Sequence, residues 1–302
     1  MLFTSIGGTV AQPSFRRRRL AKKLQEQRES AGLTVAEAVR LSGFSQAKLS
    51  RIETGAYGVS GDDVHTLCEA YGADEETTES FTRLARQAKE RNLWWRSYSD
   101  ILGNANYIEL EADSAALHAF TIDIIPGLLQ TSGYYEAIIR ADTPLVSKET
   151  VARRVEARLA RQQQIKDQNV RVWAIIDEPA LLRPVGGHAV MADQIDYLLK
   201  IADTPHVSFQ VLPLTAGAHQ SIGKPFTQFF LRDGFRVVGI DSHDGGLFME
   251  DNQRVRHFEE AWTSLAAMAL PFPHSIEVLR ARSEEHRRNA HALRKPAKMA
   301  EK

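Results

Sequence analysis

The segment TVAEAVRLSGFSQAKLSRIETG, residues 34–55, restricts the fold more than any other part of the chain. Thr34 is a favoured N-cap residue and begins a helix that extends to Ser42. Gly43 interrupts the helical pattern, and Ser45 then caps another short helix that runs to Thr54 and ends at a glycine. This spacing predicts two short helices joined by a glycine turn.

The flanking segments are helical as well. A first helix is predicted at 16–31 and stops at Gly32, a fourth is capped by Ser60, and a fifth covers about 74–92. No strand pattern occurs before Trp94, so the chain is predicted to begin with an all-α domain of five helices. The residues expected to face inward are Leu20, Leu24, Ala31, Val64, Leu67, Cys68, Tyr71, Phe81, Leu84, Ala85 and Ala88.

Beyond this region, helical stretches alternate with segments rich in Val, Ile and Phe, which predicts an α+β C-terminal domain of uncertain sheet order. Asp233 and Gly234 fit a tight hairpin. Strands are predicted at 170–177, 206–214, 225–232 and 235–241, and helices at about 131–141, 147–167, 188–203 and 251–270. We predict four segments: a disordered start at 1–13, a helix-turn-helix domain at 14–95, the α+β domain at 96–279 and a basic tail at 280–302.

The formal net charge is zero, but the charge is unevenly distributed. Residues 14–59 hold ten Lys/Arg against four Asp/Glu, and residues 280–302 hold eight against three. Residues 101–279, in contrast, hold fifteen Lys/Arg against twenty-two Asp/Glu. Because local charge governs the attraction of a polyanion, the N-terminal domain and the tail are the parts suited to nucleic acid.

Several features indicate the cellular compartment. The single cysteine, Cys68, excludes an internal disulfide and fits a reducing environment. No apolar run approaches the ~20 residues that a membrane span requires. The apolar part of the N-terminus precedes its charges, which is the reverse of a secretory signal. We therefore expect a cytoplasmic protein without a membrane partner.

The third predicted helix has two distinct faces. At 100° per residue, Leu49 and Ile52 point to the core. A polar outer face is normal for any surface helix, but Gln and Arg can also bond bases bidentately, and small residues allow close approach to a groove. The basic run RRRRLAKK just upstream favours contact with DNA. The outer face comprises Gln46, Ala47, Ser50, Arg51 and Thr54, with Lys48 at its flank.

The stretch AGLTVAEAVRLSGFSQAKLSRIETG, followed by VSGDDVHTLCEAYG, resembles the XRE family of helix-turn-helix regulators, which are related to phage Cro and repressor proteins. The resemblance implies binding of double-stranded DNA as a homodimer. It places base reading at Gln46, Ala47 and Arg51, and phosphate contacts at Ser45 and Lys48. Thr34, Ser50, Thr54, Arg17 and Arg18 complete the predicted DNA-binding set. The resemblance also implies an ion pair between Arg28 and Glu53 that ties the first helix to the third.

Four positions depart from the family pattern. Val35 stands where the family usually has a Gln that contacts a phosphate, so one phosphate contact is lost. Ala38 and Ser42 occupy usual Leu positions, whereas Val39 occupies a usual Ala position. We expect core volume to be redistributed among these helices.

The C-terminal domain resembles that of actinobacterial XRE-type regulators, including antitoxin-like regulators and developmental regulators of the WhiJ type. The resemblance covers the chain from Phe15 to about Leu279. It implies a small protein partner encoded nearby, and a small-molecule effector is the other expected input. The matching stretches are PGLLQTSGYYEAIIRA (126–141), RRVEARLARQ (153–162), DEPALLRPVGG (177–187), VLPLTAGAH (211–219) and GKPFTQFF (223–230).

No segment carries a recognisable catalytic motif. Asp177 and Glu178 could be paired carboxylates, but we favour Asp177 as the N-cap of a helix starting at Pro179. The run DSHDGG at 241–246 could bind a metal, yet Asp and Gly equally suit a turn. His219 stands alone on a loop, where an exposed or hydrogen-bonded role is more usual. We expect no catalytic residues, no metal and no cofactor, and therefore no enzyme.

Two basic segments lie outside the N-terminal domain. The segment RRVEARLARQQQIKD fits a solvated amphipathic helix better than a second nucleic-acid helix, because Glu156 lies among its cations. The run RRNAHALRKPAKMAEK, residues 287–302, is predicted to be disordered and could add nonspecific attraction to DNA.

The sequence thus predicts a sequence-specific DNA-binding transcriptional regulator whose C-terminal domain binds a small protein partner or ligand. The alternative is an antitoxin-like interaction module that mainly sequesters a small partner protein, which Val35 in place of Gln supports.

Overall fold

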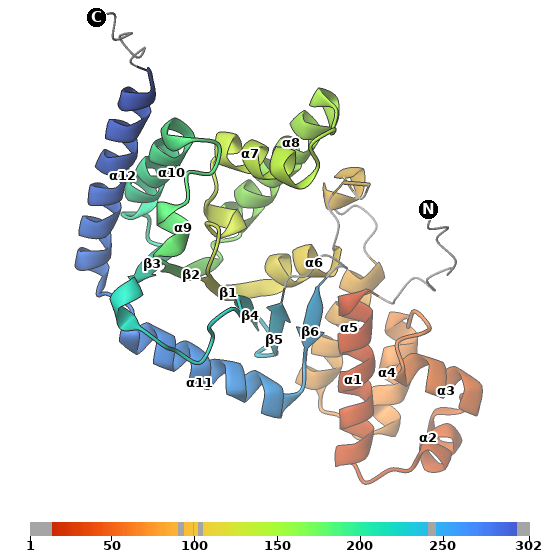
Figure 1. The fold of residues 1–302 in the computed structure, drawn as a ribbon. Coiled ribbons are helices and arrows are strands. Elements are labelled where there is room, and N and C mark those ends of the chain that lie inside the picture. Colours follow the sequence, from red (N-terminus) through yellow and green to blue (C-terminus); the bar gives the residue numbers. More distant parts are fainter. Residues whose placement is uncertain (1–13, 90–93, 99, 102–104, 241–245, 295–302) are drawn as a thin grey trace, which may run out of the picture. The chain divides into compact units, whose positions relative to one another are not determined.

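The computed structural model describes residues 14–89, 94–98, 100–101, 105–240 and 246–294 (Figure 1). The chain forms two compact units, one up to Arg96 and one from Ser97 onward. The described part of the first unit contains five α-helices, which confirms the predicted all-α region. They are α1 (Phe15–Ser30), α2 (Val35–Ser42), α3 (Gln46–Glu53), α4 (Gly61–Ala70) and α5 (Glu75–Lys89).

Local capping sets the ends of α2 and α3. The Thr34 side chain accepts a hydrogen bond from the Glu37 backbone N–H at 3.3 Å, and the Glu37 carboxylate accepts one from the Thr34 N–H at 2.8 Å. Gly43 then ends α2 with φ +69°, a left-handed conformation that glycine adopts without steric strain. Ser45 caps α3 by accepting from the Lys48 N–H at 3.2 Å. The turn between the two helices is therefore defined by its own sequence.

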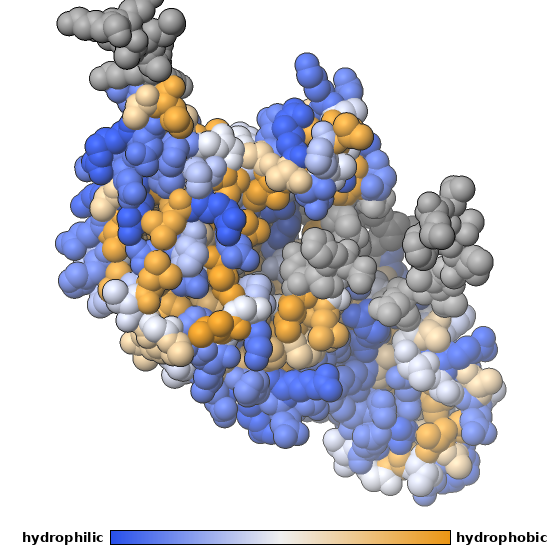
Figure 2. All heavy atoms as spheres, in the orientation of Figure 1, coloured by the Kyte–Doolittle hydropathy of each residue, from blue (hydrophilic) through white to orange (hydrophobic). Residues whose placement is uncertain are grey.

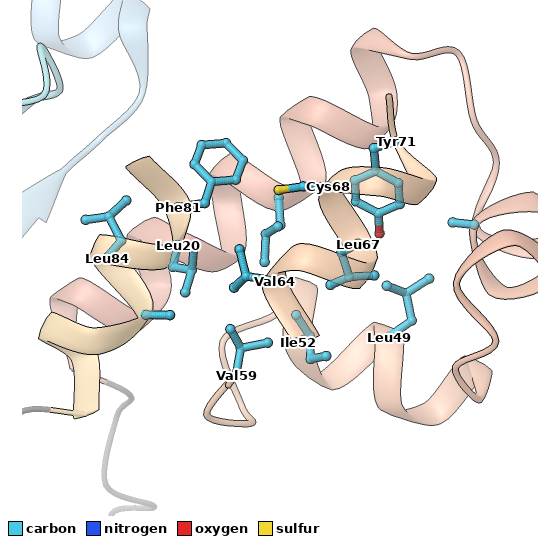
Figure 3. Close-up of a cluster of buried hydrophobic side chains, with 13 residues drawn as sticks. Leu20, Leu49, Ile52, Val59, Val64, Leu67, Cys68, Tyr71, Phe81 and Leu84 are labelled. Carbon is cyan, nitrogen blue, oxygen red and sulfur yellow. The ribbon is translucent and has the colours of Figure 1, made fainter. Parts of the chain in front are cut away.

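The core of the first unit lies between its five helices (Figure 3). Leu49 and Ile52 on α3 meet Val64 and Leu67 on α4, and all four are at most 2% exposed. Cys68 is buried in the same cluster as a free thiol. Because an eight-residue helix is marginal in isolation, this packing is what holds α3 in place. The other members include Leu20, Leu24, Ala38, Val59, Tyr71, Phe81, Leu84 and Ala85.

The described part of the second unit is a six-stranded mixed sheet with helices on both faces. Its strands are β1 (Ser114–Thr121), β2 (Arg171–Asp177), β3 (Val207–Leu212), β4 (Phe226–Leu231), β5 (Arg236–Ile240) and β6 (Leu247–Met249). Its α-helices are α6 (Ala105–Asp113), α7 (Ser132–Asp142), α8 (Lys148–Asp167), α9 (Pro179–Leu182), α10 (His188–Ile201), α11 (Asn252–Met268) and α12 (Phe272–Arg294). Short 3-10 helices occur at η1 (Trp94–Tyr98), η2 (Gly127–Leu129) and η3 (Leu214–Ala216).

The strand order is β3-β2-β1-β4-β5-β6. β1, β2 and β3 run parallel, and the chain returns through α7 and α8 and then through α9 and α10. β4 pairs antiparallel with β1, in a register that places Ala119 opposite Thr227, and β5 and β6 continue antiparallel. β1 therefore joins the parallel and the antiparallel halves of the sheet.

Two apolar clusters lie on opposite faces of this sheet. One packs Ala174 and Phe209 against α10, with Leu279 of α12 in the same cluster. The other packs Phe120 and Val238 against α11. Both outer helices are amphipathic, and Figure 2 shows mainly hydrophilic residues on the outward surfaces of α11 and α12.

Several elements differ from the sequence-based prediction. The strands β1 and β6 and the helix α6 were not predicted, although β1 is central to the sheet. The prediction of a disordered tail is wrong for residues 287–294, because α12 continues to Arg294. Within α12, Ser283 and His286 are buried, and Ser283 donates a hydrogen bond to Asp196 of α10. The predicted disordered start at 1–13, the final residues 295–302 and the DSHDG part of the turn at 241–246 lie outside the described residues.

Candidate nucleic-acid interface

The helix α3 separates a buried face from an exposed one. Leu49 and Ile52 are 0% and 2% exposed and fill the core. The opposite face carries no large apolar side chain, and it includes both hydrogen-bonding and small residues. Its exposed members are Gln46, Ala47, Ser50, Arg51 and Thr54.

Arg51 lies along its own helix. Its Nε donates to the Ala47 carbonyl at 3.2 Å, and its guanidinium lies 5.8 Å from the ring centre of Tyr57. Tyr57 is 48% exposed and lies four residues after the end of α3. Tyr57 was not among the predicted DNA-binding residues, although an aromatic residue shortly after a polar helix face can be recognised in the sequence. Arg51 can extend from this position toward a ligand because both contacts are weak and open to solvent.

Lys48 is not a free cation. Its Nζ lies 2.6 Å from Asp63 Oδ1 and 3.6 Å from the ring centre of Phe44. Burial opposes ionisation of Asp63, but hydrogen bonds from Lys48 and Ser60 outweigh this effect and lower the pKa of the carboxyl group. Lys48 must therefore exchange this carboxylate for a phosphate before it can fill the predicted role.

The four consecutive arginines of α1 divide into two pairs. Arg16 and Arg19 are buried, at 6% and 3% exposure, and Arg16 donates to the Gln87 carbonyl at 3.1 Å. Arg17 and Arg18 are half-exposed, and their backbone packs against Gly55 at the end of α3. The four arginines thus do not form one DNA-facing surface, and Arg17 and Arg18 are the more exposed of the four.

A buried ion pair fixes α3 to α1. Arg28 donates from Nε and Nη2 to the two carboxylate oxygens of Glu53, at 2.8 and 3.1 Å. The Tyr71 hydroxyl adds a third hydrogen bond to Glu53 at 3.1 Å. The hydrogen bond to Glu53 raises the pKa of Arg28, and burial together with the Glu53 charge raises the pKa of Tyr71. The pair holds the exposed face of α3 at a fixed angle to the core.

Thr34 and Val35 have structural roles at the start of α2. Thr34 is exposed, but its hydroxyl is engaged with Glu37 in the capping box. Val35 packs against the core cluster, and Ala38 beside it is fully buried. The substitution of Val for the usual Gln therefore replaces a surface contact with core volume.

Asp177 and Glu178, the two adjacent carboxylates that could have formed a catalytic pair, have different surroundings. Glu178 binds Arg282 at 2.7 Å and accepts the Leu214 N–H at 2.9 Å. Asp177 ends β2, and burial raises its pKa. Contrary to the prediction, Glu178 and not Asp177 occupies the N-cap position of α9, without a side-chain capping bond. His219 is half-buried, with its ring 5.6 Å from that of Phe120.

The arginines of α8 are mostly engaged within the second unit. Arg161 makes two 2.5 Å hydrogen bonds to the buried Glu111, and Arg158 lies 3.8 Å from the ring centre of Tyr135. Arg153 pairs with Asp100 at 2.8 Å. The prediction of a solvated amphipathic helix, with its arginines on the solvent side, is therefore wrong for Arg158 and Arg161, which pack into the domain.

Across the residues that the structure describes, no group of three or more His, Cys, Asp or Glu side chains is placed to hold a metal ion. No described helix is long and apolar enough to cross a membrane.

The fold and the exposed face of α3 define a two-unit protein with an N-terminal helix-turn-helix domain, and the family comparison agrees. A family model described as a helix-turn-helix domain matches residues 19–81. A second model, the domain of unknown function DUF5753, matches residues 105–281. This match spans more than half of the chain, so the chain belongs to the DUF5753 family.

The chain is also similar to a solved structure, that of the clp gene regulator ClgR from C. glutamicum. The two are 26% identical over 25% of this chain and 95% of that chain, with a TM-score of 0.21. No curated protein matches the chain.

Proposed function

We propose that the protein is a sequence-specific DNA-binding transcriptional regulator in which α3 reads base edges in the major groove. The observation that carries this proposal is the exposed, polar face of α3 directly opposite the buried Leu49 and Ile52. Gln46 and Arg51 on this face have the side-chain types that bond adenine and guanine bidentately. Ala47 and Ser50 leave room for close approach to the groove.

The surrounding residues supply phosphate contacts in this proposal. Ser45 lies at the N-terminus of α3, where backbone N–H groups favour an anion. Thr34 and Thr54 lie at the ends of the two helices, while Arg17 and Arg18 are half-exposed cations of α1. Lys48 can contact a phosphate as well, once its ion pair with Asp63 is broken. A homodimer would present two such faces to half-sites about 34 Å apart.

The second unit is proposed to regulate DNA occupancy by binding a ligand or a small protein encoded beside the regulator. Such an input acts only if it binds the DNA-bound and free forms with different affinity. Measuring operator affinity of the full chain with and without the purified neighbouring protein tests the protein input. An unchanged affinity would exclude that partner as a regulator.

The test of base reading uses the full chain. Selection from random DNA defines the preferred site, and the affinities of Arg51→Ala and Arg83→Ala are then compared on that site and on random DNA. Arg83 lies exposed on α5, and Arg83→Ala removes one positive charge as Arg51→Ala does. We expect Arg51→Ala to lose about 1–3 kcal/mol on the selected site and little on random DNA, with Arg83→Ala unchanged. Failure of selection to enrich a site, or equal losses on both DNAs, would reject the assignment of Arg51.

A further inference from the structure

A pocket of about 590 Å³ lies in the second unit at the carboxyl end of β1. Its volume falls within the range of about 300–1,000 Å³ that is typical of small-molecule sites. β1 supplies one wall, α6 and α8 supply Tyr107 and Arg161, and the loop after β1 supplies Ile124. In open α/β sheets, ligands bind beyond the carboxyl ends of the parallel strands, and the loop of residues 122–128 that lines this pocket follows the carboxyl end of β1.

The lining is mainly apolar. The wall from β1 carries Leu117 and Ala119, and Val172 of β2 lies beside them. Ile124 is 41% exposed although it lines the pocket, so an apolar side chain stays in contact with solvent at the rim. Apolar surface in a concave site is stabilised by contact with an apolar ligand.

The charges in the pocket are balanced internally. Glu111 and Arg161 are joined by two parallel hydrogen bonds of 2.5 Å, and their side chains are 2% and 14% exposed. Burial opposes the charge on Arg161, but the charge of Glu111 and its hydrogen bonds outweigh burial and raise the pKa of Arg161. Asp123, the other charged residue of the lining, is exposed. An ionised ligand would therefore lose hydration without gaining a buried counter-charge.

Two threonine hydroxyls provide hydrogen-bonding points in the lining. Thr227 accepts a hydrogen bond from the Tyr107 hydroxyl at 2.9 Å, and its own proton has no acceptor among the described residues. The Thr121 hydroxyl oxygen is buried and has no partner in the same part of the chain. Thr227 lies opposite Ala119, and Thr121 is two residues farther along the same face of β1. The pair suits a ligand that accepts hydrogen bonds.

We propose that this pocket binds an uncharged small molecule with a largely apolar body and a hydrogen-bond acceptor such as a carbonyl group. Binding of this molecule changes the DNA occupancy of the regulator, and this regulatory role rests on the proposed function. The binding itself depends only on the second unit.

The test uses full-length protein and the uncharged fluorophore 6-propionyl-2-(dimethylamino)naphthalene, which has an apolar ring system and a ketone. We expect saturable one-site binding with a blue shift of its emission. Thr227→Val removes the donor without changing the shape of the side chain and should weaken binding about fivefold, whereas Thr227→Ser should restore it. Ile124→Glu should weaken binding more than about fivefold, and Leu145→Glu, at a 98% exposed residue outside the pocket, should leave it unchanged.

Absence of saturable binding, or equal affinity of the wild type and Ile124→Glu, would overturn the proposal. Tighter binding of the anionic 1-anilinonaphthalene-8-sulfonate than of the uncharged probe would overturn the ligand class. DNA affinity is measured in parallel on the same protein. Probe binding without DNA binding would reject the regulator and support the pocket, whereas DNA binding without probe binding would reject the pocket alone.

Discussion

The Nζ atom of Lys48 lies 2.6 Å from Oδ1 of Asp63, so a carboxylate of α4 neutralises the cation at the flank of α3. The same carboxylate belongs to the capping box of α4, in which it accepts the Ser60 N–H at 3.2 Å. The position of Lys48 is therefore coupled to the N-terminus of the next helix. A phosphate that binds Lys48 must compete with Asp63.

Substitution Asp63→Asn should tighten DNA binding. The amide keeps an acceptor for Ser60 but releases Lys48, which becomes available to a phosphate. We expect a higher affinity for specific and random DNA alike. The slope of log K against log salt concentration should become steeper by about 0.9, which corresponds to one additional phosphate contact. Salt titrations of the full chain measure this slope. Asp62→Asn is the matched control because Asp62 is exposed on the same helix turn; an equal gain from it would attribute the effect to overall charge.

Substitution Glu53→Ala should destabilise the first unit by about 3 kcal/mol, because it leaves Arg28 and Tyr71 buried without their acceptor. Burial of the pair makes this cost larger than the value under ~1 kcal/mol that a partly exposed pair would give. Chemical denaturation of the full chain measures it. Glu69→Ala, at an exposed position on α4, is the control. Equal unfolding free energies of Glu53→Ala and Glu69→Ala would refute the role of the pair.

Substitution Gly43→Ala should lower stability by about 1 kcal/mol. The added methyl group has open space, so the cost arises from the backbone, whose φ of +69° disfavours an L side chain. Gly61→Ala is the control, because Gly61 is helical and its Cβ would meet only an ordinary contact at 3.6 Å from Thr82. Thermal melts compare the two. A larger loss for Gly61→Ala would contradict this account of the turn.

The second unit should lose stability as the pH falls from about 6.5 to 4. Burial lowers the pKa of His118 to about 4, against 6.5 for the free side chain. The unfolded chain therefore takes up a proton in this window while the folded chain does not, which favours unfolding by up to about 3 kcal/mol at the lower end. His118 stacks 4.6 Å from Trp262, so His118→Phe retains an aromatic ring there.

Unfolding free energies at several pH values test this linkage. His118→Phe should flatten the decline with pH, whereas His274→Phe, at an exposed site on α12, should not. A slope unchanged by His118→Phe would show that other groups cause the decline.

The helices of the first unit were predictable because their signals are local. Thr34, Gly43, Ser45 and Ser60 mark helix ends by their own chemistry, and Leu49 and Ile52 repeat at helical spacing. The inward placement of Arg16 and Arg19 was less evident, although they share the helical period of Leu20. Long arginine side chains can be buried when their heads find partners, which the sequence pattern does not show.

The central strand β1 could not be recognised from its sequence. SAALHAFT is rich in Ala and Leu, which favour helices, and it is packed on both faces, so polar residues do not alternate with apolar ones. The pocket could not be predicted either, because β1 forms one of its walls. Residues 287–294 at the end of α12 were predicted to be disordered because they carry many charges, and the buried contacts of this helix, at Leu279, Ser283 and His286, all precede them.

The central position of β1 also has a consequence for the order of folding. Ala119 pairs with Thr227, so one edge of β1 stays open until more than a hundred further residues have been synthesised. Closing so long a loop costs entropy before the pairing stabilises it, whereas the five N-terminal helices form through near neighbours. We expect the nascent chain to carry a folded helical unit ahead of an incomplete sheet, and this interval is when the exposed edge of β1 is open to mispairing with other chains.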